Sequence, residues 1–104
     1  MGLAIKALSA TTSPVHAFEW SLPTQSESGE WIPGEWHAVK GRIKYRRNGL
    51  HLARPDQIEW WTKHLRGRKL TAYVVEYDGQ TSVGVHGFAA RRVRILRPWQ
   101  GETL

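Results

Sequence analysis

Residues 40–54 read KGRIKYRRNGLHLAR, and this stretch decides the fold that the sequence predicts. Basic and apolar residues alternate up to position 47. Asn48 and Gly49 then supply the residue types that tolerate the two positive φ angles of a type I′ turn. The stretch therefore predicts a β-hairpin, with one strand at 40–47 and the other at 50–54.

The two faces of this hairpin are expected to differ, because successive side chains of a strand point to opposite sides. A two-residue turn would pair Arg47 with Leu50, Arg46 with His51, Tyr45 with Leu52 and Ile43 with Arg54. The face predicted to join the core carries Ile43, Tyr45, Leu50 and Leu52. The opposite, basic face carries Lys40, Arg42, Lys44, Arg46 and His51.

A helix is expected directly after the hairpin, over about 55–66. Pro55 suits its first turn, where the missing N–H needs no partner. Ile58, Trp61 and Leu65 fall at i, i+3 and i+7, the spacing of a helix that buries one face against a sheet.

A second hairpin is predicted beyond the helix. The β-branched and aromatic run at 70–77 is followed by Asp78 and Gly79, another type I′ signal, and by a returning strand at 80–85. A last strand at 90–96 alternates Val93 and Ile95 with Arg92 and Arg94, which makes a second basic strand face.

Extended segments are also expected near the N-terminus, at 3–8 and 15–20, before a long Pro/Gly/Ser-rich loop at about 21–35. The fold class is α+β: a small antiparallel sheet built from two hairpins plus flanking strands, packed against one helix. A chain of 104 residues has room for one core, so 1–104 is expected to form a single domain.

Charge is distributed unevenly along the chain. The net charge is +6, but residues 1–39 hold one lysine and four glutamates, whereas residues 40–104 hold fourteen Lys and Arg against five acids. A basic half of this kind suits an acidic partner, of which nucleic acid is the commonest. The alternative is a soluble domain whose cations are merely solvated.

Composition also excludes several classes of site. The chain has no cysteine, so disulfides, thiolate zinc sites and cysteine nucleophiles are ruled out. The five histidines show no metal-ligand spacing, and phosphate-binding loops and nucleophile elbows are missing from the sequence. We predict no metal site, no cofactor and no catalytic residue. Without a long apolar run we expect no membrane association and a cytoplasmic location.

Two groups of residues are candidates for partner binding. The first is the set of strand cations, where Arg92 and Arg94 would join the basic face of the first hairpin in contacting phosphates, with His51 as a hydrogen-bond donor to phosphate or ribose. The second is Trp60 with His64, at the margin of the helix, a composition typical of protein-binding hot spots. For each group the alternative is structural: a solvated strand face, or a tryptophan that covers a loop.

Four segments resemble a set of short uncharacterised phage and bacterial proteins that share a Gly-Leu-His turn before a short helix. They are SPVH at 13–16, NGLHLA at 48–53, WW at 60–61 and ARRVRIL at 90–96. Ala17 and Arg47 depart from the family pattern, which has Gly and Cys there. The resemblance implies a phage-encoded protein with no established activity. For such a chain we expect a non-enzymatic binding protein that docks on nucleic acid or a nucleoprotein complex, or on a host protein, as an anti-CRISPR-like inhibitor of host defence would.

A weaker resemblance is to ADP-ribosyltransferase-like folds, which use NAD. It implies that Arg46, His51, Tyr73 and Glu76 surround a nicotinamide site. The chain is short for that fold and lacks its glutamate motif, so the enzyme is the alternative interpretation.

Overall fold

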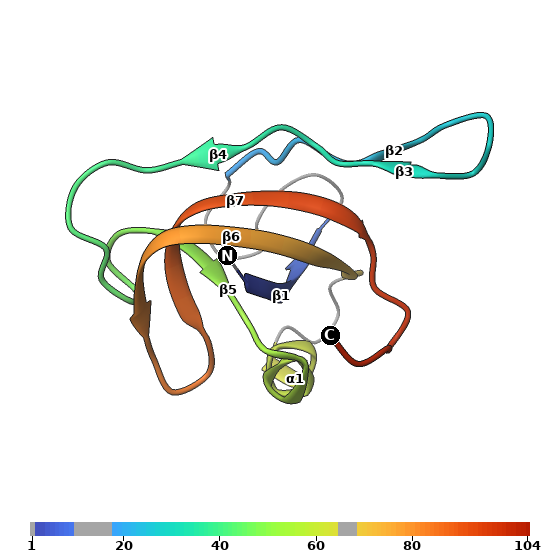
Figure 1. Ribbon diagram of the computed structural model, residues 1–104. Helices are drawn as coiled ribbons and strands as arrows, with labels where there is room; N and C mark the ends of the chain where they lie inside the picture. Colours follow the sequence, from blue (N-terminus) through green and yellow to red (C-terminus); the bar gives the residue numbers. More distant parts are fainter. Residues whose placement is uncertain (1, 10–17, 65–68) are drawn as a thin grey trace.

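The computed structural model describes residues 2–9, 18–64 and 69–104, and one antiparallel sheet forms its centre (Figure 1). The strands follow the order β1-β6-β7-β4, and β5 pairs with a neighbouring part of the same edge of β7. One short helix accompanies the sheet, so the predicted α+β class is confirmed. The elements are β1 (Gly2–Leu8), β2 (Thr24–Gln25), β3 (Trp31–Ile32), β4 (His37–Ala38), β5 (Leu50–Leu52), α1 (Ile58–His64), β6 (Thr71–Val83) and β7 (Phe88–Pro98).

The longest element is the hairpin of β6 and β7, and it is not the one that the turn signals predict. Asp78 and Gly79 lie inside β6, where Gly79 has a φ of +81° and the register with β7 slips by one residue. The dipeptide therefore forms a β-bulge rather than a turn. The chain reverses later, where the Gly84 N–H donates a 2.8 Å hydrogen bond to the Gly87 carbonyl. The predicted strand at 80–85 is wrong as a separate strand.

The sheet closes on itself into a small barrel. Along the chain of pairings β1 joins β6, β6 joins β7 and β7 joins β5. The end of β5 then returns to β1, because Ile5 and Ala53 exchange two backbone hydrogen bonds of 2.7 and 2.9 Å. Closure leaves β1 and β5 without free edges at that point. Figure 1 shows β6 and β7 curving over these two shorter strands.

The first predicted hairpin is wrong in its pairing. Lys44 and Asn48 are bonded to each other instead, with the Lys44 N–H 2.9 Å from the Asn48 carbonyl, so the bend comprises residues 45–47. The residue with a left-handed φ of +67° in this bend is Arg46. Leu50 and the rest of β5 pair with β7 rather than with residues 40–47, because β7 offers a full strand edge.

The helix begins as predicted. A 3₁₀ turn at Pro55–Gln57 leads into α1 (Ile58–His64), while the predicted end of the helix at 66, with Leu65, lies outside the described residues. Ile58 is buried with Ile5 on the outer side of β1, and Trp61 packs against the same cluster. Within residues 2–9, 18–64 and 69–104, no helix is long and apolar enough to cross a membrane.

The main core fills the barrel. The residues of this core are buried inside the barrel. They include the predicted core residues Leu50 and Leu52 as well as Val93 and Ile95 of β7. Trp20 closes one side of this core. Each such side chain contributes roughly 1.5–3 kcal/mol by burial.

The segment at 21–35 is an extended arm rather than a plain loop. It contains the two-stranded pair of β2 and β3, which projects from the barrel and exposes Trp31 and Ile32 (Figure 1). Part of the predicted strand at 15–20 lies outside the described residues, and residues 18–20 form no strand.

Candidate functional site

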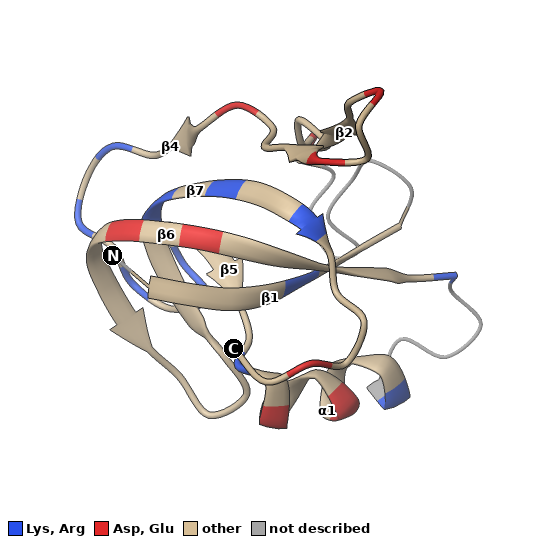
Figure 2. Cartoon of the chain, turned by 45° about the vertical axis from the view of Figure 1, so that its right-hand side comes forward, with Lys and Arg blue, Asp and Glu red and all other residues tan. Residues whose placement is uncertain are grey.

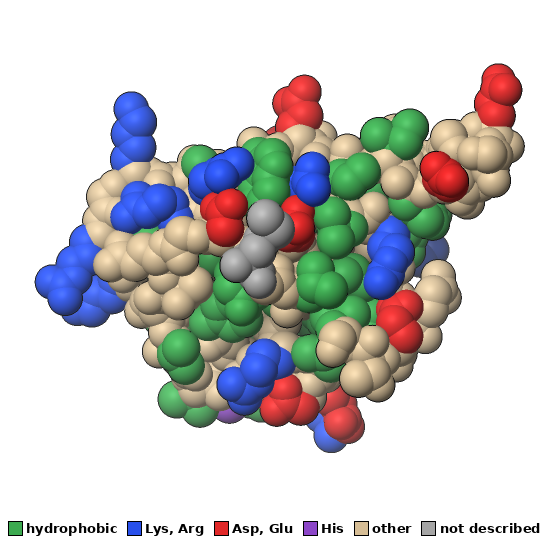
Figure 3. Space-filling model, viewed as in Figure 1, with side chains coloured by type: hydrophobic (Ala, Val, Ile, Leu, Met, Phe, Trp, Pro, Cys, Tyr) green, Lys and Arg blue, Asp and Glu red, His purple; other side chains and the backbone are tan. Residues whose placement is uncertain are grey.

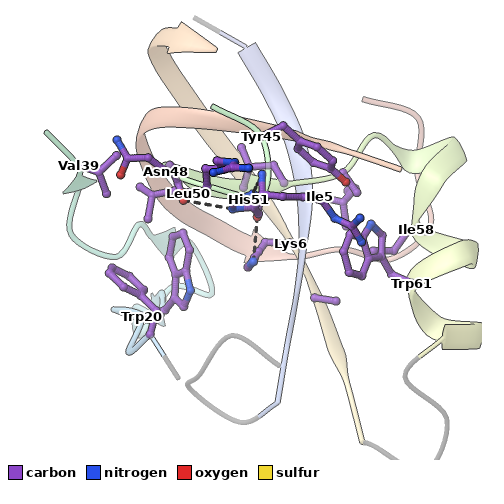
Figure 4. A pocket seen from close by; sticks show the side chains of 17 residues that line it. Ile5, Lys6, Trp20, Val39, Tyr45, Asn48, Leu50, His51, Ile58 and Trp61 are labelled. Atoms are coloured by element: carbon purple, nitrogen blue, oxygen red, sulfur yellow. Dashed lines mark hydrogen bonds between the residues drawn. The ribbon is translucent and has the colours of Figure 1, made fainter. Parts of the chain in front are cut away.

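A cavity of about 490 Å³ opens where β1 and β5 face each other (Figure 4). We call it the seam cavity. It is lined by residues 5–7 of β1, the segment 45–53 that includes β5, Phe18, Trp20, Val39 and the helix residues Ile58 and Trp61. Among the described residues, backbone hydrogen bonds join the β1 strand to the end of β5 only at Ile5 and Ala53, so the two strands separate beyond that bridge.

Lys6 lies in this cavity and is its most unusual residue. It shares a row of β1 with Ala4 and Leu8, which are fully buried in the barrel core, so its side chain is directed to the barrel interior. The Nζ atom donates a 2.8 Å hydrogen bond to the backbone carbonyl of His51 and lies 5.6 Å from the centre of the Trp20 ring. Burial lowers the pKa of Lys6 to about 8. The charged ammonium form of Lys6 is therefore disfavoured at this position compared with a lysine in water.

His51 lines the seam cavity and also holds the bend through its ring nitrogens. Its Nε2 accepts a 2.7 Å hydrogen bond from the backbone N–H of Arg46, and its Nδ1 lies 3.2 Å from the carbonyl oxygen of Gly49. The ring of Tyr45 lies 5.4 Å from the imidazole, centre to centre. An Nε2 atom that accepts the Arg46 N–H cannot donate to a phosphate at the same time, so the predicted role of His51 as a donor finds no support in this geometry.

An aromatic cluster stands beside Lys6. Trp20 makes edge-on contacts with Phe18 at 5.2 Å and with His37 at 5.0 Å between ring centres. The Nε2 of His37 accepts a 3.0 Å hydrogen bond from the backbone N–H of Ser21, and desolvation lowers the pKa of His37 while Glu35 acts in the opposite direction. The cluster gives the cavity a rigid aromatic wall.

The predicted basic face lies on a loop, not on a strand. In residues 40–47, which we call the basic loop, Ile43 is buried and Tyr45 is half-buried, while the cations between them are exposed. The predicted alternation of inward and outward side chains is therefore present without a strand pairing. The exposed cations are Lys40, Arg42, Lys44, Arg46 and Arg47. Figure 2 shows Lys and Arg positions along the chain after β4, and Figure 3 shows Lys and Arg side chains gathered at that end of the molecule.

Side chains of the barrel hold the basic loop in place. The backbone N–H of Ile43 donates to Gln80 at 3.1 Å, and that of Tyr45 donates to the Ser82 hydroxyl at 2.9 Å. From β7, the Arg91 guanidinium donates to the carbonyl oxygens of Val39 and Gly41 at 3.0 and 2.6 Å. The loop is thus an anchored surface, which preorganises its exposed cations.

Arg92 and Arg94 do not extend the basic surface. They lie directly opposite Asp78 and Glu76 of β6 and form ion pairs with them at 3.0 and 2.8 Å. The ring of Trp36 lies 4.3 and 4.9 Å from the two guanidinium carbons. The predicted alternation with the buried Val93 and Ile95 is present, but the charge of this face is compensated, because the neighbouring strand supplies carboxylates.

Trp60, half of the predicted partner site on the helix, packs against other residues of the chain. The ring of Trp60 is stacked on His86 at 3.7 Å and 8° and makes an edge-on contact with Trp61. His64 is the last residue of α1, and its side chain lies outside the described part of the structure. Trp60 covers the turn between β6 and β7, not the long loop at 21–35.

The four residues that the ADP-ribosyltransferase resemblance assigns to a nicotinamide site do not line one common cavity. Arg46 and His51 line the seam cavity, but Glu76 and Tyr73 lie on β6 and are not among its lining residues. Glu76 is bound to Arg94. Among the residues that the structure describes, no group of three His, Asp or Glu side chains is placed to hold a metal ion.

No protein-family model, curated protein or solved structure matches the chain. Both resemblances noted in the sequence therefore remain predictions. Sequence reasoning missed Lys6, which it counted only as a charge. The signal was present, because a single lysine interrupts the apolar run LAIKAL at 3–8.

Proposed function

We propose that this protein is a non-enzymatic binding protein that docks on nucleic acid through the basic loop. The observation that carries the proposal is the density of free positive charge on this loop. Five exposed cations occur in eight residues, and within the described part of the chain none of them pairs with a carboxylate.

Acidic side chains lie at the end of the molecule opposite the basic loop. The arm formed by β2 and β3 carries the exposed Glu27 and Glu30, and Figure 3 shows the acidic side chains of the arm at the end opposite the basic loop. A phosphate backbone would therefore be attracted to one end of the molecule and repelled from the other. A nucleoprotein complex offers the same phosphate surface, and inhibition of host defence is the role that the phage resemblance implies for such binding.

Nearby rings favour single strands over duplex. Phe18 is exposed beside the seam cavity, and Tyr45 within the basic loop is half-buried. Unstacked bases bind to aromatic faces of this kind, whereas the bases of a duplex are already stacked.

The test is the salt dependence of oligonucleotide affinity. A labelled single strand and the matching duplex are titrated at several salt concentrations with the wild type and with the double variant Lys40→Gln, Lys44→Gln. Counterion release predicts a steep fall in affinity as salt rises, and the double variant should lower the magnitude of the log–log slope by about 2.

The matched control is Lys63→Gln, Lys69→Gln, which removes the same charge from α1 and from the approach to β6. It should leave the slope close to the wild-type value. Equal effects of the two double variants, or no measurable binding at low salt, would remove nucleic acid as the partner.

A further inference from the structure

The seam cavity is built for an anion with an apolar body. Among the described residues that line it, the charged side chains are the cations Lys6, Arg46 and Arg47, without any Asp or Glu. Most of the remaining walls are aliphatic or aromatic. Small-molecule sites commonly combine an apolar wall with a few placed polar groups, and their volumes run from about 300 to 1,000 Å³.

Lys6 has donor capacity that the chain itself leaves open. An ammonium group has three N–H donors, and the described structure gives Lys6 one hydrogen bond, to the His51 carbonyl. Its further contact is with the Trp20 ring. Lys6 is half-buried, and desolvating its charge beside Ala4 and Leu8 is costly, so an anion in the cavity would offset that cost.

The walls on both sides of Lys6 suit a flat ring. Trp20 lies on one side of β1, while Tyr45 and Trp61 lie toward the other, as Figure 4 shows. Trp61 is fixed there by a 2.7 Å hydrogen bond from its Nε1 to the His86 carbonyl, so this wall is preformed. Arg46 and Arg47 are exposed and stand at the rim.

We propose that the seam cavity binds a small aromatic carboxylate, with the carboxylate on the Lys6 ammonium and the ring against the apolar wall of the cavity. A single half-buried ammonium matches a singly charged carboxylate better than a phosphate dianion. The proposal does not depend on the nucleic-acid proposal, because Lys6 is not part of the basic loop, although Arg46 and Arg47 at the rim of the cavity belong to it.

The experiment compares three probes of one shape by calorimetry: naphthoate, the neutral naphthylmethanol and the cationic naphthylmethylammonium. At about pH 7 the wild type should bind naphthoate about tenfold more tightly than the alcohol, which corresponds to one charge-assisted contact. The cation should bind more weakly than the alcohol. Lys6→Met should abolish the preference for naphthoate, and Lys63→Met, an exposed control on α1, should keep it.

A pH series on the wild type decides the question even if Lys6→Met does not fold. The preference for naphthoate should fall as the pH rises through and above 8, where the free Lys6 ammonium loses its proton. Equal affinity for naphthoate and the alcohol, a preference that survives in Lys6→Met, or a nucleoside monophosphate that binds more tightly than naphthoate would each overturn the proposal.

Discussion

The Nζ atom of Lys6 lies 2.8 Å from the backbone carbonyl oxygen of His51 and bridges β1 and β5 where these strands have separated. A side chain thus replaces a backbone donor beside the Ile5 and Ala53 bridge that closes the barrel. The same ammonium group faces the seam cavity. Closure of the fold and the chemistry of its cavity therefore depend on one residue.

The pH dependence of stability should reveal Lys6. Its folded pKa is about 8, below the 10.5 of an ordinary lysine, so between these values the unfolded chain binds more protons than the folded one. Stability linked to Lys6 therefore rises with pH across this window, by on the order of 3 kcal/mol in total. Urea unfolding of the wild type and of Lys6→Met at about pH 8 and about pH 10 should show this rise in the wild type alone. The same pH slope in both proteins would contradict the assignment.

Tyr45 and Gly84 form a contact that admits no side chain on the glycine. A Cβ atom at position 84 would overlap the Tyr45 ring, which lies directly against it. Gly84→Ala should therefore displace Tyr45 and destabilise the protein by about 1–3 kcal/mol. Oligonucleotide affinity should fall with it, although no cation is changed. The double variant Gly84→Ala, Tyr45→Ala should recover part of the stability, and failure to do so would place the strain elsewhere.

Arg46 combines a charge with an unfavourable backbone conformation, since its φ is +67°. Arg46→Gly and Arg46→Ala both remove the guanidinium, but only glycine adopts this conformation without cost. The glycine variant should be more stable than the alanine variant by about 1 kcal/mol in thermal or urea unfolding. Their losses of oligonucleotide affinity should be equal if the lost charge is what matters.

Arg94 is expected to matter for stability and not for binding. Its guanidinium is 2.8 Å from Glu76, whose side chain is only 16% exposed, so Arg94→Gln leaves a carboxylate without its ion pair. We expect a loss of about 1–3 kcal/mol in the free energy of unfolding. The salt slope of oligonucleotide binding should stay near that of the wild type. A slope reduced as much as in the variant lacking Lys40 and Lys44 would return Arg94 to the binding surface.

Mild acid should weaken the aromatic wall through His37. Its folded pKa lies below the ordinary 6.5 because of desolvation, so the unfolded chain takes up a proton first as the pH falls. The contribution of His37 to stability is therefore present above 6.5 and is lost as the pH drops toward the folded pKa. A protonated Nε2 also cannot accept the Ser21 N–H. His37→Gln, which keeps an acceptor but does not titrate, should lose less stability than the wild type between about pH 7.5 and about pH 5.

Local patterns in the sequence predict the elements well where burial alone decides them. The apolar run at 3–8 is β1, the helix starts at Pro55, and Ile43, Leu50 and Leu52 are buried as expected. The alternation of exposed cations in the basic loop was also correctly predicted. These features follow from side-chain periodicity and from proline geometry, which act over a few residues.

Partner strands could not be predicted in the same way. Asn48 with Gly49 and Asp78 with Gly79 both carry strong turn signals, yet neither pair makes a two-residue hairpin turn. A turn preference is worth only about 1 kcal/mol, and the nonlocal pairing of β6 and β7 over many residues outweighs it. Gly79 lies in a bulge, because the positive φ that a type I′ turn requires is also the φ of a glycine in a β-bulge.

By itself, then, the chain determined its α+β class, the position of β1, the start of the helix and the outward direction of the cations in the basic loop, since each depends on neighbours in sequence. Tertiary structure alone decided that Glu76 and Asp78 neutralise Arg94 and Arg92, because strand register brings residues far apart in sequence face to face. It also turned Lys6 from an isolated charge into the polar centre of a cavity. The place of Lys6 in the cavity depends on where the end of β5 pairs with β1, and no local sequence pattern predicts that pairing.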